Sequence, residues 1–133
     1  MCLDYDLKPE QAAKIKAEAQ RRGYIRVYKV CKEKKTGWFF GRYWRKGLHK
    51  AGRLKMYDGG WYAYLTLGAA RDKTYMSPRK YVRTCYAKPS WIKRLGTDWR
   101  SRRVGIFTHL CFPDWKTGDM TIREFREMCK GKK

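Results

Sequence analysis

A chain of 133 residues with 33 Lys and Arg against only 12 Asp and Glu has a formal net charge of +21, and self-repulsion at that charge disfavours the compact state. A strongly anionic partner is therefore expected. The aromatic content of 16% argues against intrinsic disorder, because disordered chains are poor in aromatic residues, and the length fits a single domain over residues 1–133.

The positive charge is concentrated in the middle of the chain. Residues 34–113 carry 19 of the basic side chains and only three carboxylates, Asp58, Asp72 and Asp98. Basic residues that are mixed with aromatic ones inside the chain indicate a folded binding face and not a detachable basic arm.

The five cysteines are widely spaced, and none belongs to a CxxC pattern or a Cys/His cluster. This spacing predicts reduced thiols, with no structural zinc and no cofactor. The first residues lack the pattern of a signal peptide, and no apolar stretch approaches the ~20 residues that cross a bilayer. We therefore expect a cytoplasmic protein with no membrane partner, in the host cytoplasm if the chain is viral.

The first predicted element is a helix over residues 8–22. Pro9 suits a first helical position, Glu10 suits the positive end of the helix dipole, and Gly23 supplies the stop. The apolar stripe of this helix is thin, so it is expected to pack on the edge of a larger structure. Residues 24–32 are rich in β-branched and aromatic side chains on both faces, which predicts a central strand.

Residues 34–55 combine eight basic with five aromatic side chains and contain no carboxylate. Cations that alternate with flat rings suit a phosphate backbone with unstacked bases beside it. The frequent glycines indicate a loop, with a short strand at 38–40. The alternative interpretation is a basic loop that covers the core with its aromatic residues and leaves its charges in solvent.

Three strands and a helical turn are predicted in the second half of the chain. After the turn signal at 58–60, residues 61–67 alternate between apolar and polar faces, and residues 68–73 form a helical turn. Residues 81–87 predict the next strand. Residues 104–112 predict another, with Val104, Ile106, Leu110 and Phe112 on one face.

The C-terminal part predicts a helix. Thr121 and Glu124 form an S/T-x-x-E capping box, and Ile122, Phe125 and Cys129 follow at helical spacing. Together these elements predict an α+β domain, with a mainly antiparallel sheet of about four to five strands, an N-terminal and a C-terminal helix, and the helices on one side.

Catalytic motifs are missing from the sequence. It contains no P-loop, GxGxxG, HExxH or GxSxG pattern, and three carboxylates at turns are too few to favour a metal nuclease. A Cys–His pair, Cys85 or Cys111 with His49 or His109, has no motif behind it. An enzyme that acts on a nucleotide or a nucleic acid, which would require His49 or a carboxylate of the basic middle, is the least favoured hypothesis.

The aromatic residues divide into core and surface candidates. Trp61 alternates with apolar residues and is assigned to the core. Tyr62, Tyr64, Trp44 and Trp99 lie on polar faces or beside arginines, so they are the candidates for stacking on bases.

Several segments resemble a group of small bacteriophage proteins. They are the Met-Cys-Leu start, YIRVYKV, GGWYAYLT followed by Ala69-Ala70, and YVRTCYA. The resemblance implies a bacteriophage origin, and proteins of that group often bind host or defence machinery. The GGWYAYLT segment is also similar to strands of ADP-ribosyltransferases, but the catalytic glutamate of that family has no counterpart downstream.

The second basic-aromatic stretch, residues 91–103, completes the functional prediction of a non-enzymatic nucleic-acid-binding protein whose partner is DNA or RNA. The alternative is a bacteriophage anti-defence protein, such as an anti-CRISPR, that occupies a nucleic-acid-binding or acidic surface of a host protein or ribonucleoprotein complex. The predicted nucleic-acid-binding residues are Arg42, Trp44, Arg45, Lys46, His49, Lys50, Arg53, Lys55, Trp99, Arg100, Arg102 and Arg103.

Overall fold

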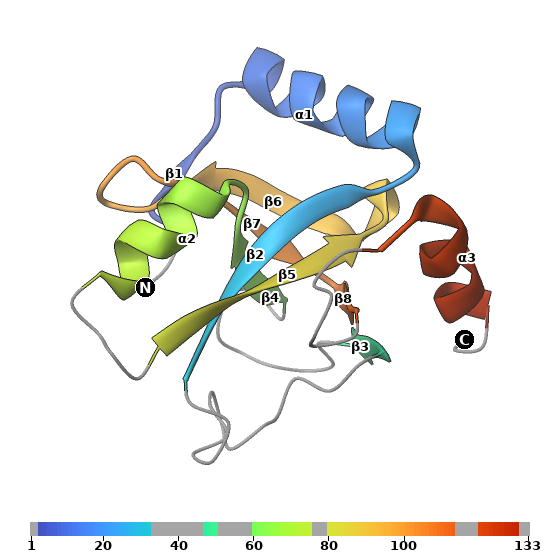
Figure 1. The fold of residues 1–133 in the computed structure, drawn as a ribbon. Helices are drawn as coiled ribbons and strands as arrows, with labels where there is room; N and C mark the ends of the chain where they lie inside the picture. Colours follow the sequence, from blue (N-terminus) through green and yellow to red (C-terminus); the bar gives the residue numbers. More distant parts are fainter. Residues whose placement is uncertain (1–2, 33–46, 51–59, 76–79, 114–119, 131–133) are drawn as a thin grey trace.

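The structure is a computed structural model that describes residues 3–32, 47–50, 60–75, 80–113 and 120–130 (Figure 1). Within these residues eight strands form one antiparallel sheet, in the order β1-β6-β7-β4-β2-β5-β8-β3. The strands are β1 (Tyr5–Asp6), β2 (Ile25–Lys32), β3 (Gly47–Lys50), β4 (Trp61–Tyr64), β5 (Lys80–Ala87), β6 (Ile92–Thr97), β7 (Arg103–Phe107) and β8 (His109–Phe112). The helices are α1 (Pro9–Arg22), α2 (Leu67–Thr74) and α3 (Ile122–Lys130), and a 3₁₀ turn, η3, covers Pro89–Trp91.

The predicted fold class is confirmed in its coarse form, as an α+β domain with an antiparallel sheet. The predicted number of four to five strands is wrong, because the sheet of the described residues has eight. The structure also has a third helix, α2, in the middle of the chain, in addition to the predicted N-terminal and C-terminal helices. The additional strands include the two-residue β1 and the four-residue β3. Elements of this length are held by pairing with a neighbouring strand, and a local sequence pattern does not reveal that pairing.

Helix α1 and strand β2 form where the sequence predicts them. Gly23 ends α1 in the left-handed conformation, with φ of 85°, and its N–H donates to the carbonyl of Ala19 at 2.8 Å. Glycine adopts this conformation without a steric penalty. Strand β2 pairs with β5 along its whole length and with β4 on its other side, so its predicted central position is confirmed.

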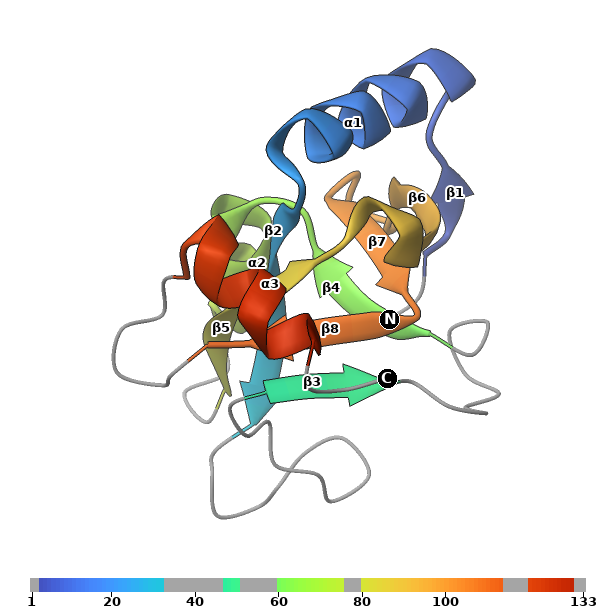
Figure 2. The same cartoon turned by 90° about the vertical axis from the view of Figure 1, so that its right-hand side faces the viewer.

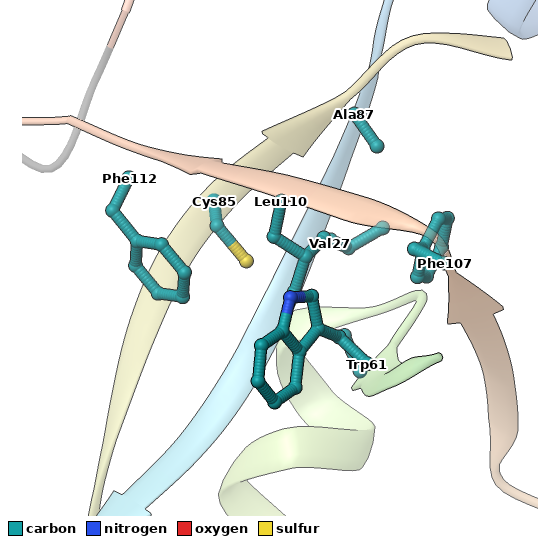
Figure 3. Packing of buried hydrophobic residues seen from close by; sticks show 8 residues of the cluster. Val27, Trp61, Cys85, Ala87, Phe107, Leu110 and Phe112 are labelled. Atoms are coloured by element: carbon teal, nitrogen blue, oxygen red, sulfur yellow. The ribbon is translucent and has the colours of Figure 1, made fainter. Parts of the chain in front are cut away.

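The sheet is strongly curled around one of its faces. The indole Nε1 of Trp61 in β4 donates to the carbonyl of His49 in β3 at 3.1 Å, although β2, β5 and β8 separate these two strands in the sheet. Apolar side chains fill the inside of the curl, as Figure 3 shows for the cluster around Trp61, Leu110 and Phe112. The prediction that Trp61 belongs to the core is confirmed, since it is buried.

The prediction of one strand over 104–112 is wrong. The chain turns at Thr108, whose N–H donates to the carbonyl of Trp91 at 2.9 Å, and continues as β8. Strand β7 pairs with β4 and β6, whereas β8 pairs with β3 and β5. Because the turn changes the alternation, Ile106 and Leu110 lie in different clusters and do not share one face.

Helices α2 and α3 pack on the opposite face of the sheet from the Trp61 cluster. Ala70 of α2 belongs to a cluster against which Val82 of β5 packs, and Phe125 of α3 packs with Tyr86 of the same strand. Val82 and Tyr86 are four residues apart, so they lie on the same face of β5. The predicted pair of Thr121 and Glu124 caps α3: the Glu124 N–H donates to the Thr121 hydroxyl at 3.1 Å, and that hydroxyl donates to the Glu124 carboxylate at 3.1 Å.

Candidate nucleic-acid interface

The turn between β6 and β7 is organised by one buried carboxylate. Asp98 is 2% exposed, and its Oδ1 accepts the backbone N–H groups of Arg100 and Arg102 at 2.9 and 3.0 Å. The backbone of Asp98 also bonds to Ser101 and Arg102, and Ser101 has a positive φ of 61°. The four residues after Asp98 are therefore held in one conformation, and we name Asp98–Arg103 the hairpin tip.

Arg102 belongs to the structural part of the hairpin tip. Its Nε donates to Asp98 Oδ2 at 2.7 Å, and its Nη1 donates to Asp72 Oδ2 at 2.8 Å. The side chain of Arg102 is only 10% exposed, and its guanidinium lies 5.6 Å from the centroid of the Tyr64 ring. A side chain that is held this firmly by two carboxylates is a poor phosphate ligand, so the prediction of a phosphate contact is corrected for Arg102.

Trp99 and Arg100 project from the same tip. Trp99 is 66% exposed, and the guanidinium of Arg100 lies 4.8 Å from the centroid of its ring, which is a cation–π distance. Arg100 also approaches Asp72 at 3.8 Å, but both side chains are more than half exposed. Such a solvent-exposed pair contributes little, so a phosphate can compete with it.

Arg103 follows directly and opens strand β7. It is exposed, and within the described part of the chain it forms no ion pair. The hairpin tip thus presents one exposed indole with the guanidinium of Arg100 beside it, and the exposed Arg103 follows at the start of β7. All of these side chains come from the predicted stretch 91–103.

The two predicted site residues of β3 lie elsewhere. His49 is half-buried, and its ring packs edge-on against Phe112 at 5.3 Å, so it is part of the rim of the core. Lys50 is exposed and is paired in register with His109 of β8. The other predicted residues, Arg42, Trp44, Arg45, Lys46, Arg53 and Lys55, lie outside the described residues, as does the short strand at 38–40.

His109 is the centre of a second basic-aromatic cluster beside β3. The His109 ring stacks on Trp91 with 5.0 Å between the centroids, and the Nζ of Lys88 lies 5.6 Å from the Trp91 ring. Burial lowers the pKa of His109, and the charges of Lys50 and Lys88 lower it further. Of this cluster, Trp91 is only half-exposed and contacts the core, so it offers a smaller stacking surface than Trp99.

The hairpin tip and β3 do not form one continuous face. The tip is the loop that joins β6 to β7, on the side of the molecule where α1 lies, whereas β3 is the last strand at the far edge of the sheet. Both views show the two regions well apart (Figures 1 and 2). The described residues therefore provide two separate candidate surfaces, and the tip is the more exposed one.

Two of the predicted stacking residues are buried. Tyr62 and Tyr64 are 5% and 2% exposed, and their rings meet edge-on at 5.5 Å beneath α2. Burial raises the pKa of both phenols. The prediction that they stack on bases is therefore wrong, because α2 covers the face that the polar alternation assigned to solvent.

The structure also disfavours the cysteine nucleophiles. Cys85 and Cys111 are fully buried, and burial raises the pKa of the Cys111 thiol to about 12. The thiol of Cys111 donates to Met128 Sδ at 2.8 Å. Among the described residues, no three His, Cys, Asp or Glu side chains gather in a way that would hold a metal ion.

Two of the described basic side chains are buried, and their neighbours in the sequence do not predict this burial. Lys29 and Arg83 are 5% and 7% exposed, and they donate to the carbonyls of Tyr62 and Pro113 at 2.7 and 2.9 Å. Sequence reasoning also missed the role of Asp98. The signal for it was an isolated carboxylate in the basic segment TDWRSRR, where one acid stands among three arginines and a tryptophan.

Within the described residues no helix is long and apolar enough to cross a membrane. The chain matches no known protein family, no curated protein and no solved structure. The resemblance to bacteriophage proteins stays a prediction.

Proposed function

We propose that the protein binds nucleic acid without catalysing a reaction, and that the hairpin tip is a contact surface. The observation that supports this most directly is Trp99, which is 66% exposed with the Arg100 guanidinium 4.8 Å from its ring. A base stacks on the open face of such a ring for about 1–3 kcal/mol. We expect Arg100 and Arg103, which are both exposed, to contact the neighbouring phosphates.

The rigidity of the tip supports the same proposal. Exposing a tryptophan to water is unfavourable, so an exposed indole on a fixed turn indicates a binding surface more strongly than a scattered apolar side chain does. The buried Asp98 fixes the turn before any ligand arrives, and a preformed site loses less conformational entropy on binding. The net charge of +21 adds long-range attraction for a polyanion.

A titration of short DNA and RNA oligonucleotides, read by fluorescence anisotropy at two salt concentrations, tests the proposal. We expect binding that weakens steeply with salt, because phosphate contacts release condensed counterions. Binding that is absent or indifferent to salt overturns the proposal. The two oligonucleotides also determine whether DNA or RNA is preferred.

The alternative proposal, an anti-defence protein that inhibits a host complex, uses the same surface against a protein. A pull-down from bacterial lysate after nuclease treatment distinguishes the two. If a protein partner is still captured after nuclease treatment, and neither oligonucleotide binds, the partner of this surface is an acidic protein and not a nucleic acid. A partner that disappears with nuclease was bridged by nucleic acid.

A further inference from the structure

A groove of about 600 Å³ separates α1 from the sheet. One wall is the inner side of α1, and the other is formed by residues at the start of β2 and by Arg103 of β7. Figure 1 shows α1 lying along one end of the sheet. The volume lies within the range of about 300–1,000 Å³ that is typical of small-ligand sites.

The groove exists because the inner face of α1 is not apolar. The residues that line it recur at helical spacing, namely Gln11, Lys14, Ile15, Glu18 and Arg22. A helix that packs closely on a sheet places large apolar side chains at such positions, but in α1 only the small Ala19 is buried. The helix therefore stands away from the sheet over a polar space.

The charges in the groove are predominantly positive. Four cations line it, Lys14, Arg22, Arg26 and Arg103, against the single carboxylate of Glu18. Glu18 accepts hydrogen bonds from Arg21 and Arg22, and the bond from Arg21 is the largest factor that lowers its pKa. The carboxylate is thus already satisfied along α1 itself.

Lys14 and Arg103 face the groove from its two walls. Both side chains are exposed, and neither forms an ion pair within the described residues. Because the cations that line the groove outnumber its one carboxylate, Glu18, the groove attracts an anion. The half-buried Tyr24 and Ile25 also line the groove, which adds an apolar surface of the kind against which a base or a sugar packs.

We propose that the groove between α1 and the sheet binds the phosphate groups of a nucleotide, either a free one or one within a strand. Arg103 closes the hairpin tip and also lines the groove, so a strand held at Trp99 can continue towards α1. The groove shares Arg103 with the tip but is not lined by Trp99 or Arg100, and free-nucleotide binding does not depend on the proposed function.

Isothermal titration with ADP tests the free-nucleotide arm, and anisotropy with a short oligonucleotide tests the strand arm. The groove variant is the double substitution Lys14→Gln and Arg103→Gln. Its control is Lys16→Gln and Arg123→Gln, which removes the same two charges from exposed positions of α1 and α3 outside the groove. Trp99→Ala reports on the tip alone.

We expect the groove variant to weaken binding of ADP by about tenfold or more, because it removes two charged hydrogen-bond donors to the phosphates. The control variant and Trp99→Ala should bind ADP like the unchanged protein. If ADP does not bind but Lys14→Gln alone, which leaves Arg103 of the tip in place, weakens oligonucleotide binding more than Lys16→Gln does, the phosphates belong to a strand. If the groove variant and its control have equal affinity for ADP and equal affinity for the oligonucleotide, the inference is overturned. Failure of the proposed function is a different result, namely oligonucleotide binding that is absent or unaffected by salt.

Discussion

The hairpin tip and the edge strand β3 both carry basic and aromatic side chains, but they differ in what surrounds the charges. At the tip, Asp98 and Asp72 hold Arg102 in place, and this leaves Trp99 and Arg100 exposed on a fixed turn. Beside β3, Lys50 and Lys88 meet no carboxylate among the described residues. The comparison shows that an acidic residue inside a basic segment marks the place where the cations are organised.

The largest expected effect is on stability, from the substitution Asp98→Ala. It removes the acceptor of three hydrogen bonds and leaves the nearly buried guanidinium of Arg102 without its main partner. Breaking one side of a buried ion pair costs about 3–5 kcal/mol, so the free energy of unfolding in urea should fall by that amount.

Asp72→Ala is the matched control for that change. Its carboxylate pairs with the same Arg102 but is half exposed, so the loss should stay below about 1 kcal/mol. Equal losses in the two variants would contradict the view that the buried carboxylate organises the tip.

The next effect is on affinity, from Trp99→Ala. The affinity for an oligonucleotide should fall by the stacking contribution of about 1–3 kcal/mol, measured by anisotropy, while the stability changes by less than about 0.5 kcal/mol. Tyr75→Ala removes another exposed ring, which is 82% exposed at the end of α2, and should leave affinity unchanged. The tip account fails if both variants lose the same affinity.

A smaller effect is expected on the salt dependence. Arg100→Gln removes one phosphate contact, so the slope of log affinity against log salt should become shallower by about 0.7–0.9. Lys50→Gln removes one charge at β3 and serves as the comparison. A larger change in slope for Lys50→Gln than for Arg100→Gln would move the main contact surface to β3.

The smallest effect concerns pH and distinguishes β3 from the tip. Burial and the charges of Lys50 and Lys88 lower the pKa of His109, so the folded protein resists protonation there. Below the ordinary pKa of about 6.5 the unfolded chain takes up a proton that the folded state excludes. Stability therefore falls as the pH decreases from that value through the lowered pKa of His109.

Lys50→Gln should raise the pKa of His109, because it removes one of the repelling charges, and an NMR titration of the His109 ring measures the change. Arg100→Gln, a charge removed at the tip, is the control. A His109 pKa that is the same in the unchanged protein and in Lys50→Gln would show that Lys50 does not act on this histidine.

Much of the fold could be predicted where a local signal was sufficient. Proline and glycine define the ends of α1, and the capping box at Thr121 begins α3. The short edge strands β1 and β3 lack such signals, because their conformation depends on partners that are distant in the chain. The turn at Thr108 was missed for the same reason, since alternation predicts one strand and only the change of pairing partners reveals two.

The candidate site could be predicted only in part. Exposure of Trp99 follows from its neighbours, since it lies in a basic turn with no apolar alternation. The burial of Tyr64 does not follow, because it depends on α2 folding back over β4. The polar inner stripe of α1 was visible in the sequence as a thin apolar face, but the groove depends on how far the helix stands from the sheet.

The most direct test of the central claim is an NMR map of the backbone amides during titration with a short oligonucleotide. The account predicts the largest shifts at the hairpin tip, including the Trp99 indole, with smaller shifts of groove residues such as Lys14, and little change at His49 and Lys50. Shifts that are confined to β3, or that avoid the hairpin tip, would contradict it.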